Sequence, residues 1–139
     1  MARKTARAAA VQMEYENILG GDGGEDTLRG LIEFTPEEDD QAYIDGILSG
    51  VQAHAAELDA LIEKCLKGWA LDRLAKVDLA ILRVAAYELA YTQDTPDAVV
   101  IDEAVTLAKR FDCPQAGKFI NGVLAAALAC LHEEKGADA

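Results

Sequence analysis

The chain has 139 residues, a formal net charge of −12, and a composition that is 51% hydrophobic but only 6% aromatic. A chain of this length forms one domain, or two very small ones, around its own core, and no apolar run reaches the roughly 18 residues that a membrane span requires. The N-terminus has Arg and Lys followed by Ala, Gln and Glu instead of a signal-peptide core, so we expect a cytoplasmic protein without a membrane segment.

The charges are unevenly distributed along the chain. Residues 1 to 13 contain three basic and no acidic side chains, residues 14 to 63 one basic and fourteen acidic, and residues 64 to 139 nine basic and eleven acidic. The first three cations are Arg3, Lys4 and Arg7. A helix start is unfavourable for them, because its free amide groups attract acids. No acid precedes Glu14, so we expect an anion from outside the chain to offset this charge.

The first predicted helix runs from about Lys4 to Leu19, where apolar residues recur every three or four positions and two glycines follow. The sequence GGDGGED at residues 20–26 then predicts an acidic, flexible loop. It lacks the Lys and the preceding strand of a phosphate-binding loop. A weak calcium site is the alternative, with Asp22, Glu25 and Asp26 as ligands.

The sequence TPEEDD at residues 35–40 is typical of a capped helix start. Two apolar stripes follow, and either Gly50 or the Ala-rich stretch after it divides them. The sequence KGW at residues 67–69 looks like a joint between two halves, and we expect Trp69 to be a packing residue that bridges them.

The second half also has helical periodicity. Residues 70–92 predict one long helix, residues 99–110 a shorter one, and Pro114 opens a last helix that continues to about Leu131. No run alternates with the period of a strand. We therefore expect an all-α fold.

Catalytic and metal-binding patterns are missing from the sequence. The three cysteines, Cys65, Cys113 and Cys130, form no paired motif and are interpreted as small buried hydrophobic residues, and the two histidines stand alone. No nucleophile motif or metal-binding motif occurs. We therefore expect a binding protein that uses no metal and no cofactor, rather than an enzyme.

Four sequence blocks carry a resemblance to a known family. They are Ala6-Arg7 with Gln12 and Tyr15, LDRLAKVDLAILRVAAYEL at 71–89, VVIDEAVTLAKRF at 99–111 and GKFINGVL at 117–124. In this order and at these separations, the chain resembles the N-utilisation substance B family, NusB, over nearly its whole length.

The resemblance implies a single domain with about seven helices, arranged as two three-helix-bundle halves at about residues 1–67 and 68–139. It also implies a non-enzymatic role in transcription antitermination. A family member binds the boxA element of nascent ribosomal RNA leader transcripts together with the ribosomal protein NusE, in a complex with RNA polymerase and other Nus factors. The resemblance further allows a homodimer that pairs through the RNA-binding face.

The residues that match the family's RNA-binding positions, or lie close to its RNA side, are Arg3, Lys4, Arg7, Asp72, Lys118, Phe119 and Asn121. Asp78 matches an acidic position on the NusE-facing surface, and we expect it to be exposed. The RNA phosphates are then the anion expected at the N-terminus. Two of these residues have structural alternatives, Phe119 as a core residue and Asn121 as a hydrogen-bonding residue between helices.

One departure from the family pattern bears on the RNA site. Glu14 falls within roughly 20° of Arg7 by helical angle, at 100° per residue, so we expect it to neutralise part of the basic site and Glu14→Gln to strengthen RNA binding. The competing hypothesis is an acidic helical adaptor that contacts proteins only, supported by the acidic segment at residues 14–63.

Overall fold

The computed structural model describes residues 3–20, 38–68, 70–92 and 95–138. Within these ranges the chain forms six α-helices and one 3-10 helix, and no strand. They are α1 (Arg3–Ile18), α3 (Glu38–Ala53), α4 (Ala55–Lys64), η1 (Leu71–Arg73), α5 (Lys76–Tyr91), α6 (Asp97–Phe111) and α7 (Ala116–Asp138). The all-helical class predicted from the sequence is confirmed.

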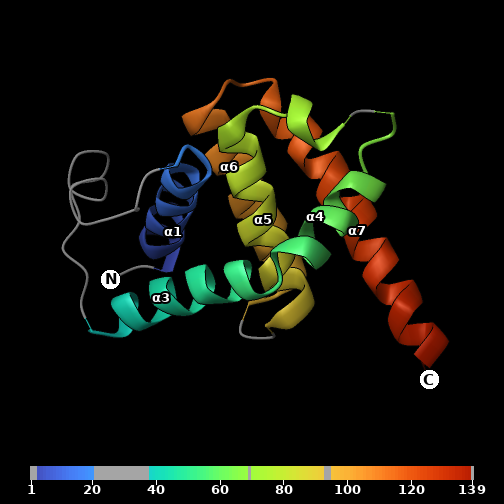
Figure 1. The fold of residues 1–139 in the computed structure, drawn as a ribbon, viewed down its shortest axis with the longest axis horizontal. Helices are drawn as coiled ribbons and strands as arrows, with labels where there is room; N and C mark the ends of the chain where they lie inside the picture. The colour runs from blue at the N-terminus through green and yellow to red at the C-terminus, as the bar shows by residue number, and fades with distance from the viewer. Residues whose placement is uncertain (1–2, 21–37, 69, 93–94, 139) are drawn as a thin grey trace.

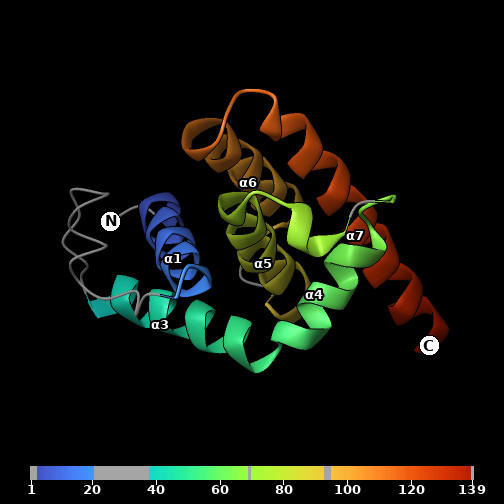
Figure 2. The same cartoon turned by 45° about the horizontal axis from the view of Figure 1, so that its top comes forward.

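Helix α5 is the centre of the fold. Both views place it between α1 on one side and α4 and α7 on the other (Figure 1 and Figure 2), and it contacts α1, α3, α4, α6 and α7. Ten of its sixteen residues are buried. A helix that is apolar around most of its circumference belongs inside a protein, which explains why the strongest periodic block of the sequence forms the central helix.

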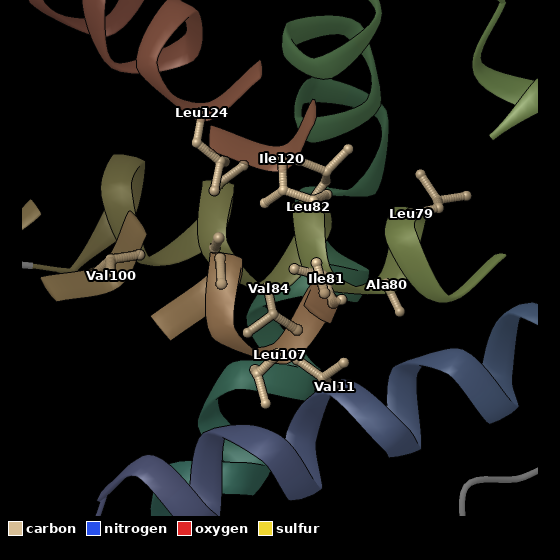
Figure 3. Packing of buried hydrophobic residues seen from close by; sticks show 14 of the residues in the cluster. Val11, Leu79, Ala80, Ile81, Leu82, Val84, Val100, Leu107, Ile120 and Leu124 are labelled. Carbon is tan, nitrogen blue, oxygen red and sulfur yellow. The ribbon is translucent and has the colours of Figure 1, made fainter. Parts of the chain in front are cut away.

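The hydrophobic core surrounds α5 on several sides. Figure 3 shows Val11 of α1, Val84 of α5 and Leu107 of α6 close together, and Ile120 of α7 next to Leu82. Helix α1 buries four alanines as well as Val11. Because alanine side chains are short, α1 approaches its neighbours closely, since the distance between packed helices depends on the side chains at their contact.

Helices α3 and α5 pack through a glycine and a tyrosine. A Cβ atom at Gly50 would collide with the ring of Tyr87, so the missing side chain makes room for the ring. Gly50 therefore lies inside α3 and does not divide the two apolar stripes. The division between α3 and α4 is at His54, in the Ala-rich stretch that was the other predicted position.

The prediction of one continuous helix over residues 70–92 is wrong. The chain forms η1, then leaves the helical conformation at Leu74 (ψ 146°) and Ala75 (ψ 138°) before α5 begins. The apolar spacing continues across this break, because Leu74 is buried as well, and so the sequence pattern alone does not reveal it.

The end of α4 leads into a tight turn in which Lys67 (φ 37°) and Gly68 (φ 92°) adopt left-handed conformations. Three predicted features lie outside the described residues. They are Trp69, the acidic stretch at residues 21–26 with its calcium alternative, and the first half of the TPEEDD helix start, residues 35–37. The division into two halves near residue 67 stays a prediction. None of the helices in the described ranges is both long and apolar enough to cross a membrane.

Candidate functional site

Arg7 of α1 lies inside the molecule, where α1 meets α5 and α6. Its side chain forms a two-pronged ion pair with Glu88 of α5, with Nε 2.5 Å from Oε1 and Nη2 2.8 Å from Oε2, and it also pairs with Glu103 of α6. Both Arg7 and Glu88 are 2% exposed. The expectation that the chain itself offers no acid for Arg7 is therefore wrong.

The surroundings of Arg7 keep its charge in place. Burial alone would lower the pKa of its guanidinium, but the hydrogen-bonded pair with Glu88 outweighs burial, and the net pKa is raised. The ring of Tyr43 from α3 also lies 5.8 Å from the guanidinium carbon, within the range of a cation–π contact. The role of Arg7 in RNA binding stays a prediction, whereas its role in joining α1 to α5 and α6 is visible in the structure.

Glu14 forms an ion pair with Arg83 and not with Arg7, the cation that the sequence analysis expected. Arg83 of α5 donates to Glu14 at 3.0 Å and to Asp59 of α4 at 2.8 Å, and Glu14 is only 3% exposed. The predicted helical angle between Glu14 and Arg7 ignores their separation of about two turns, roughly 10 Å along the axis. The expectation that Glu14 neutralises Arg7 is therefore replaced by a Glu14–Arg83–Asp59 ion-pair network.

Asp78, in the first turn of α5, is buried rather than exposed as expected, with 7% of its surface accessible. Burial, together with the neighbouring carboxyl group of Asp112, raises the pKa of Asp78 to about 7. Burial on α5 begins at Asp78 itself, because Lys76 at the start of the helix is exposed whereas Asp78, Leu79 and Ala80 are buried. The match to the family's sequence pattern does not show whether the side chain of Asp78 is buried or exposed.

Three of the predicted residues lie in the first turns of α7. Lys118 and Asn121 are exposed, whereas Phe119 is half-buried and packs against the core. The exposure of Asn121 does not support its alternative role between packed helices. Lys118 and Phe119 line a groove of about 260 Å³ together with Cys65, Leu66, Lys67, Gly122 and Val123.

Lys67 is a groove residue that the sequence analysis missed. It lies on the same groove as Lys118 because the left-handed turn at Lys67 and Gly68 brings the end of α4 alongside α7. The glycine after Lys67 was the only local signal for this turn, and nothing in the sequence indicated which helix the turn would face. The groove thus has two lysines next to one aromatic ring.

Asp72 lies on another groove. It is exposed on η1 and lines this second groove with residues of α1, α4, η1 and α5, which are Ile18, Glu63, Leu71, Lys76, Leu79 and Arg83. The structure therefore does not bring Asp72 into the groove of Lys118 and Phe119. Arg3 and Lys4 lie in the first turn of α1, and their side chains lie outside what the structure describes.

The remaining candidate chemistry is sparse. Cys65 is buried as expected, while Cys113 and Cys130 are half-buried, and all three are free thiols. His54 stacks on Tyr91 with ring centres 3.9 Å apart, and both contact Glu57, an association that the sequence did not predict. Among the described residues, no group of three or more His, Cys, Asp or Glu residues could hold a metal ion.

Comparison with known proteins identifies the family. Residues 3–129 match the sequence profile of the NusB family. The chain belongs to the NusB family. The transcription antitermination protein NusB of Acetivibrio thermocellus is 41% identical over 125 residues, which cover 89% of this chain and 86% of that protein. The resemblance inferred from the four sequence blocks is confirmed.

Solved NusB structures share the fold. NusB of T. maritima superimposes with a TM-score of 0.81 at 31% identity, covering 93% of this chain and 92% of that one. A structure of the antitermination factors NusB and NusE in complex with double-stranded RNA gives a TM-score of 0.78 at 29% identity, covering 92% and 96%. The protein is thus a transcription antitermination protein of the NusB family, which is a non-enzymatic family.

Proposed function

We propose that this NusB-family protein binds the boxA element of nascent ribosomal RNA leader transcripts together with the ribosomal protein NusE, and so takes part in an RNA polymerase antitermination complex. The observation that carries the proposal is the likeness, over 92% of the chain, to NusB in its complex with NusE and double-stranded RNA. The proposal assigns the same two kinds of partner to this chain.

The RNA-binding surface that we propose consists of the α7 groove and the start of α1. Lys67 and Lys118 offer cations for phosphates, and the half-buried ring of Phe119 offers a face on which an unpaired base can stack. Asn121, exposed one turn further along α7, can donate to and accept from a base edge. Arg3 and Lys4 add two cations at the N-terminus of α1.

Net charge does not contradict an RNA-binding role. The protein has a formal charge of −12, but exposed charges further apart than about 8 Å are largely screened at physiological salt. Arg83 faces two carboxylates, Glu14 and Asp59, and stays within the protein. The lysines of the α7 groove are exposed, and so they remain available to phosphates.

Fluorescence anisotropy with a labelled boxA RNA and a scrambled RNA, with and without NusE, tests this proposal. We expect Phe119→Ala to weaken boxA binding by about 1–3 kcal/mol, the usual contribution of one base–aromatic stack. Phe111→Ala is the matched control, because it also removes a half-buried ring at the end of a helix. Equal binding of the two RNAs, or equal losses in the two variants, would contradict the proposal.

An adaptor that contacts proteins only is the second candidate function. One observation favours it. Arg7 forms ion pairs with Glu88 and Glu103 inside the protein, so Arg3 and Lys4 are the cations of the N-terminal group that have no such pair on record, and fewer cations weaken the attraction for RNA. The same titration separates the two functions. An adaptor binds NusE but adds nothing to the affinity of NusE for boxA RNA.

A further inference from the structure

A groove of about 400 Å³ lies along α4, between this helix, the end of α5 and the C-terminal half of α7. Helix α5 separates it from α1 (Figure 2). Leu61, Tyr91 and Leu131 contribute to its apolar walls, and Glu57 and Lys64 are its two charged residues. The side chain of Tyr91 is 45% exposed. Because aromatic rings are enriched where proteins meet, this groove is a candidate contact surface.

His54 and Tyr91 hold Glu57 in position on the edge of the groove. Nδ1 of His54 lies 2.6 Å from Oε2 of Glu57, and the Tyr91 hydroxyl donates to the same oxygen at 3.0 Å. These hydrogen bonds, that of His54 first, lower the pKa of Glu57, so its carboxylate is charged at neutral pH. The side chain of Glu57 is 63% exposed, and its Oε1 has no hydrogen bond among the described residues.

Lys64 gives the groove the opposite charge. It lies seven residues after Glu57 on the same helix and is exposed. Seven residues span roughly 10 Å along a helix axis, and no ion pair joins the two side chains. Within the described part of the chain, Glu57 meets no lysine or arginine and Lys64 meets no acid. Each charge of the groove therefore lacks a partner that a second molecule can provide.

We propose that this surface of α4 binds a second copy of the chain, with the two α4 helices packed antiparallel about a two-fold axis. The midpoint between residues 57 and 64 coincides with the midpoint between residues 60 and 61. An axis at this point brings Glu57 of each copy opposite Lys64 of the partner subunit. A two-fold interface requires a surface that is complementary to itself, and the order acid, apolar centre, base along α4 meets this requirement.

The centre of the surface is suited to close packing. Ala60 is exposed on α4, and its small side chain allows two helix axes to approach each other closely. Tyr91 and Leu131 flank the same groove and become covered when the second copy docks. Helix α4 has ten residues, so it is only roughly 15 Å long. We therefore expect a small interface and a weak, reversible dimer.

This surface is separate from the residues that we propose for RNA binding. Leu131 and Lys118 are thirteen residues apart on α7, which corresponds to roughly 20 Å along the helix axis, and α5 lies between α4 and α1 (Figure 1). A dimer formed through α4 therefore differs from pairing through the RNA-binding face. The inference does not depend on RNA binding, and boxA RNA should leave the dimer intact.

Sedimentation equilibrium over a range of protein concentrations measures this self-association. Glu57→Lys and Lys64→Glu should each weaken it by about tenfold or more, because each substitution places like charges opposite one another at two symmetric contacts. An equimolar mixture of the two variants should associate as well as the natural protein, since opposite charges then meet again at both contacts. Glu63→Lys is the matched control, because it makes the same charge change on an exposed α4 residue that lines another groove.

Ala60→Arg tests the centre of the interface without removing any hydrogen bond of the folded chain. It places a large cation on an exposed position, so it should prevent self-association while circular dichroism shows unchanged helicity. A chain that stays monomeric at every concentration, or a mixture of Glu57→Lys and Lys64→Glu that fails to associate, overturns the inference. A dimer that dissociates when boxA RNA is added also overturns it, because the copies then pair through the RNA-binding face.

Discussion

Arg7 and Glu88 lie 81 residues apart in the chain and form a two-pronged ion pair at the junction of α1 and α5. The same guanidinium pairs with Glu103 of α6, so a single side chain joins three helices. The basic start of the sequence therefore serves two purposes. Its innermost cation, Arg7, pairs with acids inside the protein, and contact of Arg7, Arg3 and Lys4 with an external anion stays a prediction.

Replacing Arg7 should destabilise the fold. Arg7→Met leaves Glu88 and Glu103 without their cation, and removing one partner of a buried ion pair costs about 3–5 kcal/mol. Arg7→Lys keeps the charge but loses the fork geometry, so we expect a smaller loss. Urea denaturation followed by circular dichroism measures both. A loss below about 1 kcal/mol for Arg7→Met would show that the pair contributes little to stability.

Glu14→Gln should lower stability rather than strengthen RNA binding. Glu14 accepts from Arg83 at 3.0 Å, and hydrogen bonds to charged groups contribute about 1.5–3 kcal/mol. The carboxylate is buried, so it exerts no direct influence on an RNA chain at the surface. The urea denaturation midpoint and the RNA affinity of the Glu14→Gln variant test this prediction. An unchanged midpoint with tighter RNA binding would instead support the expectation from the sequence that Glu14 weakens RNA binding.

The two glycines of α3 should respond oppositely to alanine. At Gly50 the added methyl group collides with the Tyr87 ring, and overpacking of this kind costs about 1–3 kcal/mol. At Gly46 nothing lies within 4 Å of an added Cβ, so Gly46→Ala should gain up to about 1 kcal/mol from helix propensity. Thermal or urea unfolding of the two variants measures the contrast, and equal effects at the two positions would contradict the packing described here.

Asp78→Asn should change how stability depends on pH. The pKa of Asp78 is raised from 3.8 to about 7, so between these values the folded protein keeps a proton that the unfolded chain has lost. Stability from this group is present at low pH and is lost as the pH rises from about 4 to about 7. The asparagine variant should therefore be more stable than the natural protein at pH 8 and nearly equal at pH 4.

Denaturation at several pH values compares the two proteins directly. Asp102→Asn serves as the control, because Asp102 is exposed on α6. A constant difference between Asp78→Asn and the natural protein across this pH range would mean that Asp78 titrates normally. Asparagine is preferred to lysine as the replacement, because a lysine at this buried position would disturb the fold itself.

Local patterns in the sequence predicted the helices well. The first helix was expected over about residues 4–19 and is found at Arg3–Ile18, and the helix expected over residues 99–110 is found at Asp97–Phe111. Apolar residues at three- and four-residue spacing determine these elements. The break before α5 was missed because Leu74 continues the apolar pattern while its backbone is extended.

Contacts between distant residues were beyond a single sequence. Whether Arg7 faces solvent or Glu88 depends on how α1 packs against α5, and no local pattern encodes that packing. The helical angle placed Glu14 and Arg7 on nearly the same side of α1, yet the two residues lie on turns that face different residues of α5, Arg83 and Glu88. Lys67 was missed for the same reason, since its place beside Lys118 depends on a turn that brings α4 to α7.

The salt dependence of boxA RNA binding, measured with NusE present, tests the central claim most directly. With Arg3, Lys4, Lys67 and Lys118 as four phosphate contacts, log affinity should fall with log salt at a slope of about −3, or roughly −0.7 per contact. Lys118→Ala should reduce this slope by about 0.7, whereas Lys64→Ala, which removes an exposed lysine that lines a different groove, should not change it. A slope near zero, or equal effects of the two lysine variants, would contradict RNA binding at the α7 groove.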